Sequence, residues 1–154
     1  MHRQISSCLY LIVCFVFFLW VDLYFSTQLI RQLDAGMVIS TKVFALTYVK
    51  NYGAAFSILQ DSRELLIILS VVAITLLFGY VINHLKSISL KSIFFISLLS
   101  AGIAGNLHER IAYGYVRDFF EIKAFNFPVF NISDIFITVG VFALIILILA
   151  KETK

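Results

Sequence analysis

Residues 65–81 read LLIILSVVAITLLFGYV, a run without a charged side chain. A bilayer is crossed by a helix of about 20 mostly apolar residues, so this run indicates a transmembrane helix. Further apolar runs lie at residues 5–25, 88–107 and 135–150, and the last of these is short for a span. A short span is completed by the polar turn before it or by local thinning of the bilayer. We therefore predict an all-α membrane protein with four transmembrane helices.

The composition supports the same class of protein. The chain has 154 residues, of which 61% are hydrophobic and 14% are charged, and its mean hydropathy is +0.98. These values lie outside the range of soluble globular domains. The length leaves room for a single polytopic membrane domain over residues 1–154. A net charge of +3 from dispersed basic residues argues against a nucleic-acid-binding protein.

The distribution of basic residues predicts the orientation. Lysine and arginine, with few acids beside them, occur at the N-terminus, between the second and third runs, and in the C-terminal tail: Arg3, Lys86, Lys91, Lys151 and Lys154. Such segments stay on the cytoplasmic side. Loops 28–63 and 108–134 have nearly balanced charges and are expected on the outer face. Residues 41–59 contain alternating and β-branched stretches, which predict a small extracytoplasmic β-rich subdomain.

Asp118 and Asp134 are the acidic residues that attract attention, since both lie beside predicted spans. Carboxylates close to hydrocarbon are costly and commonly functional. Two carboxyls that share a proton and a water are the minimum needed to hydrolyse a peptide bond. Two structural explanations stay open at this point. Asp134 suits a helix N-cap, and Asp118 suits a loop carboxylate paired with Arg110 or Arg117.

A metal site and a transporter function fit the sequence less well than a peptidase. Residues 108–112 read HERIA and begin like the helical zinc motif H-E-x-x-H, but Ala112 replaces the second histidine, so no metal site is expected. A small transporter that used the two aspartates as a proton relay would place acids within its spans near mid-bilayer. Here the acids lie at the ends of the spans.

Four segments, in order, give the chain a family resemblance. The first three are NYGAAFS at residues 51–57, GNLHER at 105–110 and GYVRDF at 114–119, and the fourth is FNISD at 130–134. They resemble the N-x-G-A-A-F, G-N-L-x-D-R, G-x-V-x-D-F and F-N-x-A-D segments of the lipoprotein signal peptidases (signal peptidase II). The resemblance covers nearly the whole chain.

The resemblance implies an aspartic protease of the bacterial inner membrane, with Asp118 and Asp134 as its catalytic pair and no metal or organic cofactor. Its substrate would be a diacylglyceryl-modified prolipoprotein, cut just before the lipidated cysteine, and globomycin would inhibit it. We expect a monomer in contact with membrane lipid. Residues expected to bind substrate or support the site are Asn51, Gly53, Asn106, Arg110, Asn131, Asp22 and Glu109. For Arg110, a structural ion pair with Glu109 is an equal alternative.

The chain departs from the family pattern at two positions. The family usually has a lysine four residues after the aspartate that ends its first span, whereas Asp22 is followed at that spacing by Ser26. Glu109 stands where the family has an aspartate. These departures allow a divergent second copy of the enzyme with a narrower range of substrates. An alternative of another class is a catalytically silent relative that binds lipidated precursors or braces a membrane complex.

Overall fold

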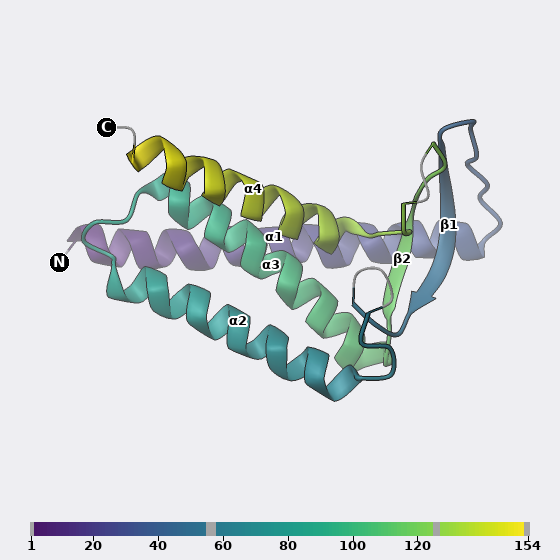
Figure 1. Ribbon diagram of the computed structural model, residues 1–154, viewed down its shortest axis with the longest axis horizontal. Helices are drawn as coiled ribbons and strands as arrows, with labels where there is room; N and C mark the ends of the chain where they lie inside the picture. The colour runs from purple at the N-terminus through teal and green to yellow at the C-terminus, as the bar shows by residue number, and fades with distance from the viewer. Residues whose placement is uncertain (1, 55–57, 125–126, 153–154) are drawn as a thin grey trace.

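Long helices dominate the computed structural model, which describes residues 2–54, 58–124 and 127–152. In chain order the elements are α1 (His2–Asp34), β1 (Phe44–Asn51), α2 (Arg63–Asn83), α3 (Leu90–Tyr113), β2 (Val116–Ile122) and α4 (Ile132–Glu152). The four helices are long and apolar enough to cross a membrane. Both chain ends lie at one end of the bundle and the two strands lie at the other (Figure 1). The predicted fold class is confirmed.

Helix α3 is the centre of the bundle, since it packs against α1, α2 and α4. Of its most apolar 18-residue window 56% is buried, against 11% for each of the other helices. Close packing between helices depends on small residues. A Cβ atom at Gly102 would collide with the backbone oxygen of Ser133, and one at Gly105 would collide with the side chains of Asp22 and Ser133. Helices α1 and α4 therefore approach α3 where it carries glycine.

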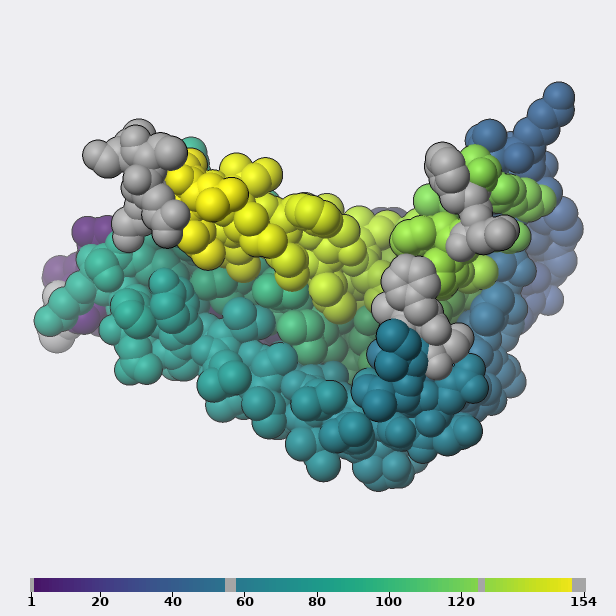
Figure 2. All heavy atoms as spheres, in the orientation of Figure 1, coloured from purple at the N-terminus to yellow at the C-terminus, as the bar shows by residue number. Residues whose placement is uncertain are grey.

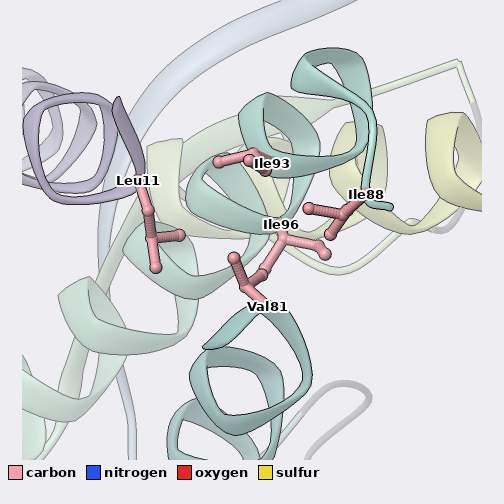
Figure 3. Packing of buried hydrophobic residues seen from close by; sticks show 5 residues of the cluster. All are labelled: Leu11, Val81, Ile88, Ile93 and Ile96. Carbon is pink, nitrogen blue, oxygen red and sulfur yellow. The ribbon is translucent and has the colours of Figure 1, made fainter. Parts of the chain in front are cut away.

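A buried apolar cluster holds together the end of the bundle opposite the strands. It joins α1, α2 and α3 and the turn between the last two, through Leu11, Val81, Ile88, Ile93 and Ile96 (Figure 3). Many other large apolar side chains are exposed, among them Phe17 and Trp20 of α1 and Leu76 of α2. Such outward-facing apolar side chains suit a bundle whose solvent is lipid.

The two strands form an antiparallel sheet across the other end of the helices (Figure 1). The register places Val49 opposite Asp118 and Asn51 opposite Val116, with an irregularity between Leu46 and Val49. The expected strand region therefore contains β1, but the second strand, within the loop after α3, was not predicted. The segment before α4 also pairs with β2, through Phe130 and Phe120.

Three helix ends differ from the expected spans. Helix α1 continues to Asp34 and α3 to Tyr113, so the outer loops begin after those residues and not at residues 28 and 108. Hydropathy detects the part of a helix that lipid surrounds, and the polar turns that continue it into water give no such signal. Helix α4 begins at Ile132, so Asp134 lies inside its first turn. The N-cap interpretation of Asp134 is therefore wrong.

Candidate active site

A cavity of about 840 Å³ lies beneath the sheet, between α2 and α4, with α3 forming its floor. In the space-filling view α3 (green) is visible in the hollow between α4 (yellow) and α2 (teal) (Figure 2). The side of the cavity toward the helices is apolar and includes Leu69, Ala73 and Ile137. Asp118 and Asp134 both line its polar end. The structure thus brings the two predicted carboxyls to one cavity.

The two aspartates lie on different elements. Asp118 is on β2 and is 2% exposed. Asp134 is in the first turn of α4. The backbone of Phe130 pairs with β2: its oxygen accepts hydrogen bonds from the N–H groups of Phe119 and Phe120 at 3.0 and 2.8 Å. This short pairing places Asn131, the next residue, beside Asp118.

Asn131 contacts both carboxyls. Its Nδ2 donates to Asp118 Oδ1 at 2.8 Å, and its backbone N–H donates to Asp134 Oδ2 at 3.2 Å. Two further amides complete the network, since Asn51 Nδ2 donates to Asp118 Oδ2 at 3.0 Å and Asn106 Nδ2 donates to Asp134 Oδ1 at 2.9 Å. Asn131 Nδ2 also lies 3.0 Å from Asn106 Oδ1. The three predicted asparagines therefore hold the pair from β1, from α3 and from the residue just before α4.

The same contacts begin helix α4. Asn131 precedes the first helical residue, and its Oδ1 accepts a hydrogen bond from the backbone N–H of Asp134 at 2.9 Å. Because the Asp134 carboxylate accepts the backbone N–H of Asn131 in return, the two residues form a reciprocal capping box. The helix start and the position of the Asp134 carboxyl are thus set together. The free N–H groups and dipole of this helix end also favour a negative charge there.

Arg110 is buried and supports the site through backbone oxygens. Its guanidinium donates to the carbonyl of Gly53 at 2.8 Å and to that of Asn106 at 3.2 Å. The Gly53 N–H donates to Asn51 Oδ1 at 2.9 Å, so Arg110 and Asn51 both hold the chain just after β1. The remaining residues of this motif, 55–57, lie outside the described residues.

Glu109 pairs with Arg117 and not with Arg110, which corrects the structural alternative for Arg110. The Arg117 guanidinium donates to both carboxylate oxygens of Glu109, at 2.5 and 2.6 Å. Neighbouring residues on a helix point in directions about 100° apart, so Glu109 faces away from the cavity when Arg110 faces it. Arg117 likewise points to the other side of β2 from Asp118, which excludes that ion pair as well.

Asp22 lies behind the network, on α1, and is 2% exposed. It accepts hydrogen bonds from Ser133 Oγ at 2.5 Å and from Ser26 Oγ at 3.3 Å. Of the predicted residues, Asn51, Asn106 and Arg110 line the cavity with the two aspartates, whereas Asp22 and Glu109 do not. Gly53 and Asn131 do not line it either, but they bond to residues that do. Ser133 was missed as a site residue, because a serine at the start of a helix carries no signal of a partner on another helix.

Asp118 has the chemistry expected of a proton-holding carboxyl. Burial, and then the negative charge of Asp134, raises the pKa of Asp118 from 3.8 to about 7, although Asn51, Asn131 and Arg110 act in the opposite direction. Close carboxyls of this kind titrate as a pair and retain one proton near neutral pH. No cluster of three or more metal-ligating side chains occurs within 2–54, 58–124 and 127–152.

Comparisons with known proteins agree with this geometry. The family model described as signal peptidase (SPase) II matches residues 10–150. A lipoprotein signal peptidase of Streptococcus pneumoniae is 34% identical over 86% of this chain and 87% of its own. Another, from Caldicellulosiruptor bescii, is 49% identical over 71% of this chain and 69% of its own.

A solved structure of a bacterial membrane enzyme superposes with a TM-score of 0.76 at 28% identity, covering 92% of this chain and 88% of that one. The family match spans both strands and all of the motifs around the carboxyl pair. With the fold, the segments and the family model in agreement, the chain belongs to the signal peptidase II family and is a membrane-embedded peptidase.

Proposed function

We propose that this protein is an intramembrane aspartic endopeptidase that removes the signal peptide from diacylglyceryl-modified bacterial prolipoproteins. Cleavage occurs just before the lipidated cysteine. The observation that carries the proposal is the pair Asp118 and Asp134, both bonded to Asn131 in the wall of one cavity. Relatives named lipoprotein signal peptidase support the class of substrate.

In the proposed mechanism the two carboxyls share one proton. The raised pKa of Asp118, about 7, makes it the proton holder, and the helix start favours ionised Asp134. Asp134 removes a proton from a water as the water oxygen attacks the scissile carbonyl carbon. Asp118 hydrogen-bonds the carbonyl oxygen and stabilises the developing negative charge. The tetrahedral intermediate then collapses, the C–N bond breaks, and the leaving nitrogen takes the proton from Asp134.

The positive charge of Arg110 neutralises the net negative charge of the carboxyl pair. With one shared proton the carboxyls carry one negative charge, and the buried guanidinium of Arg110 supplies one positive charge without itself bonding to either carboxylate. A buried charge requires such compensation. Its bonds to backbone oxygens fix the guanidinium in place, so that neither carboxyl is drawn out of the pair.

The cavity offers a path for a lipid-modified substrate. Its polar end contains the carboxyls, and its apolar part lies between α2 and α4, where Leu69 and Ile137 line it. We infer that the signal peptide enters between these helices while the diacylglyceryl chains remain in lipid. Binding energy far from the cleaved bond then positions the reacting carbonyl. A globomycin-type inhibitor would occupy the same cavity.

The charge distribution supports an inner-membrane orientation for the single polytopic domain. Both termini lie at the end of the bundle away from the sheet (Figure 1). By the loop charges, that end is cytoplasmic and the site lies at the outer face. We expect the monomer to be sufficient, because every side chain of the proposed mechanism comes from one chain.

The test is a gel-shift assay on a diacylated prolipoprotein, with mass spectrometry to locate the new N-terminus. Asp118→Asn and Asp134→Asn are expected to lower kcat by about 10⁴-fold or more, as for catalytic groups that act as a unit. Asp34→Asn is the matched control, since Asp34 is exposed at the end of α1. Globomycin should inhibit, and a chelator should have no effect.

Cleavage at the wild-type rate by either aspartate variant would refute the mechanism. Binding of the lipidated precursor without any turnover by the wild-type protein would favour a catalytically silent relative. Loss of cleavage in the presence of a chelator would instead require a metal and would bring the His108–Glu109 pair back into consideration.

A further inference from the structure

A buried hydrogen bond links the first turn of α4 to α1. Ser133 Oγ donates to Asp22 Oδ2 at 2.5 Å, and both residues are nearly inaccessible, at 3% and 2% exposure. Within the described ranges Asp22 has no ion-pair partner, since the ion pair found there joins Arg117 to Glu109. A buried carboxylate must be hydrogen-bonded to be tolerated. The two serine hydroxyls, of Ser133 and Ser26, are therefore the donors that hold Asp22.

The packing around this bond leaves it little freedom. Gly105 of α3 faces it so closely that a Cβ atom there would collide with both the Asp22 carboxylate and the Ser133 hydroxyl. Gly102 is similarly close to the backbone oxygen of Ser133. Ser133 is thus confined between α1 and α3, through its side chain on one side and its backbone on the other.

Ser133 is also the residue directly before Asp134. The capping box with Asn131 fixes Asp134 within α4, and Asn106 of α3 bonds to the Asp134 carboxyl. The Ser133–Asp22 bond ties the same turn to α1. The other hydroxyl, of Ser26, lies on α1 four residues from Asp22. Its bond stays within one helix and joins no two elements.

We propose that Ser133 is a positioning residue, whose bond to Asp22 holds the first turn of α4 so that Asp134 stays in register with Asp118. The inference rests on the proposed function and adds a residue that does not contact substrate, since Ser133 does not line the cavity. A displacement of about 1 Å at a reacting group costs on the order of 100-fold in rate. Loss of this contact should therefore affect kcat and leave substrate binding intact.

The experiment compares Ser133→Ala with Ser26→Ala, a matched control that removes the other hydrogen bond of the same carboxylate. Both variants lose one hydroxyl and gain no bulk. We expect Ser133→Ala to lower kcat by about 10- to 100-fold with KM within about 3-fold of wild type. Ser26→Ala should retain kcat within about 3-fold, and the melting temperature of each variant is measured in the same detergent.

Three results would overturn the inference. The first is a kcat of Ser133→Ala within about 3-fold of wild type. The second is an equal fall in kcat for Ser26→Ala when both variants lose the same melting temperature. The third is a change in Ser133→Ala that affects KM and not kcat. If Ser133→Ala does not fold, Asp22→Asn, which keeps the size of the side chain and an oxygen that accepts the Ser133 hydroxyl, must fold and retain kcat within about 3-fold for the inference to stand. Absence of cleavage by wild-type protein would refute the proposed function, and the two failures are therefore distinguishable.

Discussion

Replacement of Asn51 by alanine should move the alkaline limit of activity to higher pH. Asn51 Nδ2 donates to Asp118 Oδ2 at 3.0 Å, and this bond favours the ionised carboxylate. Burial and the charge of Asp134 raise the pKa of Asp118 to about 7 in spite of it. The proposed reaction requires the proton on the pair, so activity falls as pH rises through this value. Without the amide, Asp118 keeps its proton to higher pH.

The magnitude follows from the bond that is lost. A hydrogen bond to a charged group is worth about 1.5–3 kcal/mol, and one pKa unit corresponds to about 1.4 kcal/mol. The alkaline limb should therefore move up by about one to two pH units, from near pH 7 toward pH 8 or 9. The maximum rate should fall as well, because Asn51 also accepts the N–H of Gly53 and holds the chain beside the site.

The assay is kcat/KM for a diacylated peptide between pH 5 and pH 9.5, which reports the ionisations of the free enzyme. Thr47→Ala is the control, since Thr47 is on the same strand and does not line the cavity. It should leave the limb unchanged. An Asn51→Ala limb that stays in place, or moves to lower pH, would refute the reasoning, whatever the loss in rate. A purely structural role would lower the rate at every pH.

Three further predictions concern stability. The folded-state pKa of Asp118 lies above its ordinary value of 3.8, so the contribution of this carboxyl to stability is fully present below about pH 4 and is lost as the pH rises to about 7. Asp118→Asn should therefore be more stable than wild type over that interval, by at most about 4 kcal/mol in the free energy of unfolding. Melting temperatures of both proteins across this pH range check the difference. Glu109→Ala leaves a nearly buried arginine unpaired and should cost about 3–5 kcal/mol in unfolding by denaturant. Gly105→Ala should lower the melting temperature, because the collision of the new Cβ atom costs about 1–3 kcal/mol. Gly79→Ala should not, since nothing lies within 4 Å of a Cβ atom there. Equal effects of the two substitutions would contradict the packing argument.

Much of the fold could be predicted because the membrane restricts the solutions. Uninterrupted apolar runs have to be helices in lipid, and the glycines at 102 and 105 indicate close helix packing. The partner of β1 could not be predicted in this way. β2 is a short strand in which the charged residues Arg117 and Asp118 interrupt the apolar pattern, and it is defined by its pairing to residues far away in the chain. No local periodicity contains that information.

The candidate site was predictable in its composition and less so in its contacts. The motif residues Asn51, Asn106 and Asn131 do meet at the carboxyl pair. The contact of Arg110 with the carbonyl of Gly53 was not foreseen, since it depends on how the chain returns after β1. The Glu109–Arg117 pair was missed because the direction of a side chain on β2 is unknown until the strand is known.

The two departures from the family pattern concern the same part of the structure. Glu109 bonds to Arg117, the residue before Asp118, and Ser26 bonds to Asp22, which in turn holds Ser133, the residue before Asp134. Each carboxyl of the proposed catalytic pair is thus preceded by a side chain that points away from the cavity to a buried acid. Changes at these acids alter how the pair is held and leave untouched the surface that meets substrate. A substitution at Glu109 or Asp22 should therefore change kcat and stability first, whereas one at Ser26, whose bond stays within α1, should have little effect on kcat. The choice of substrate should follow the residues that line the cavity.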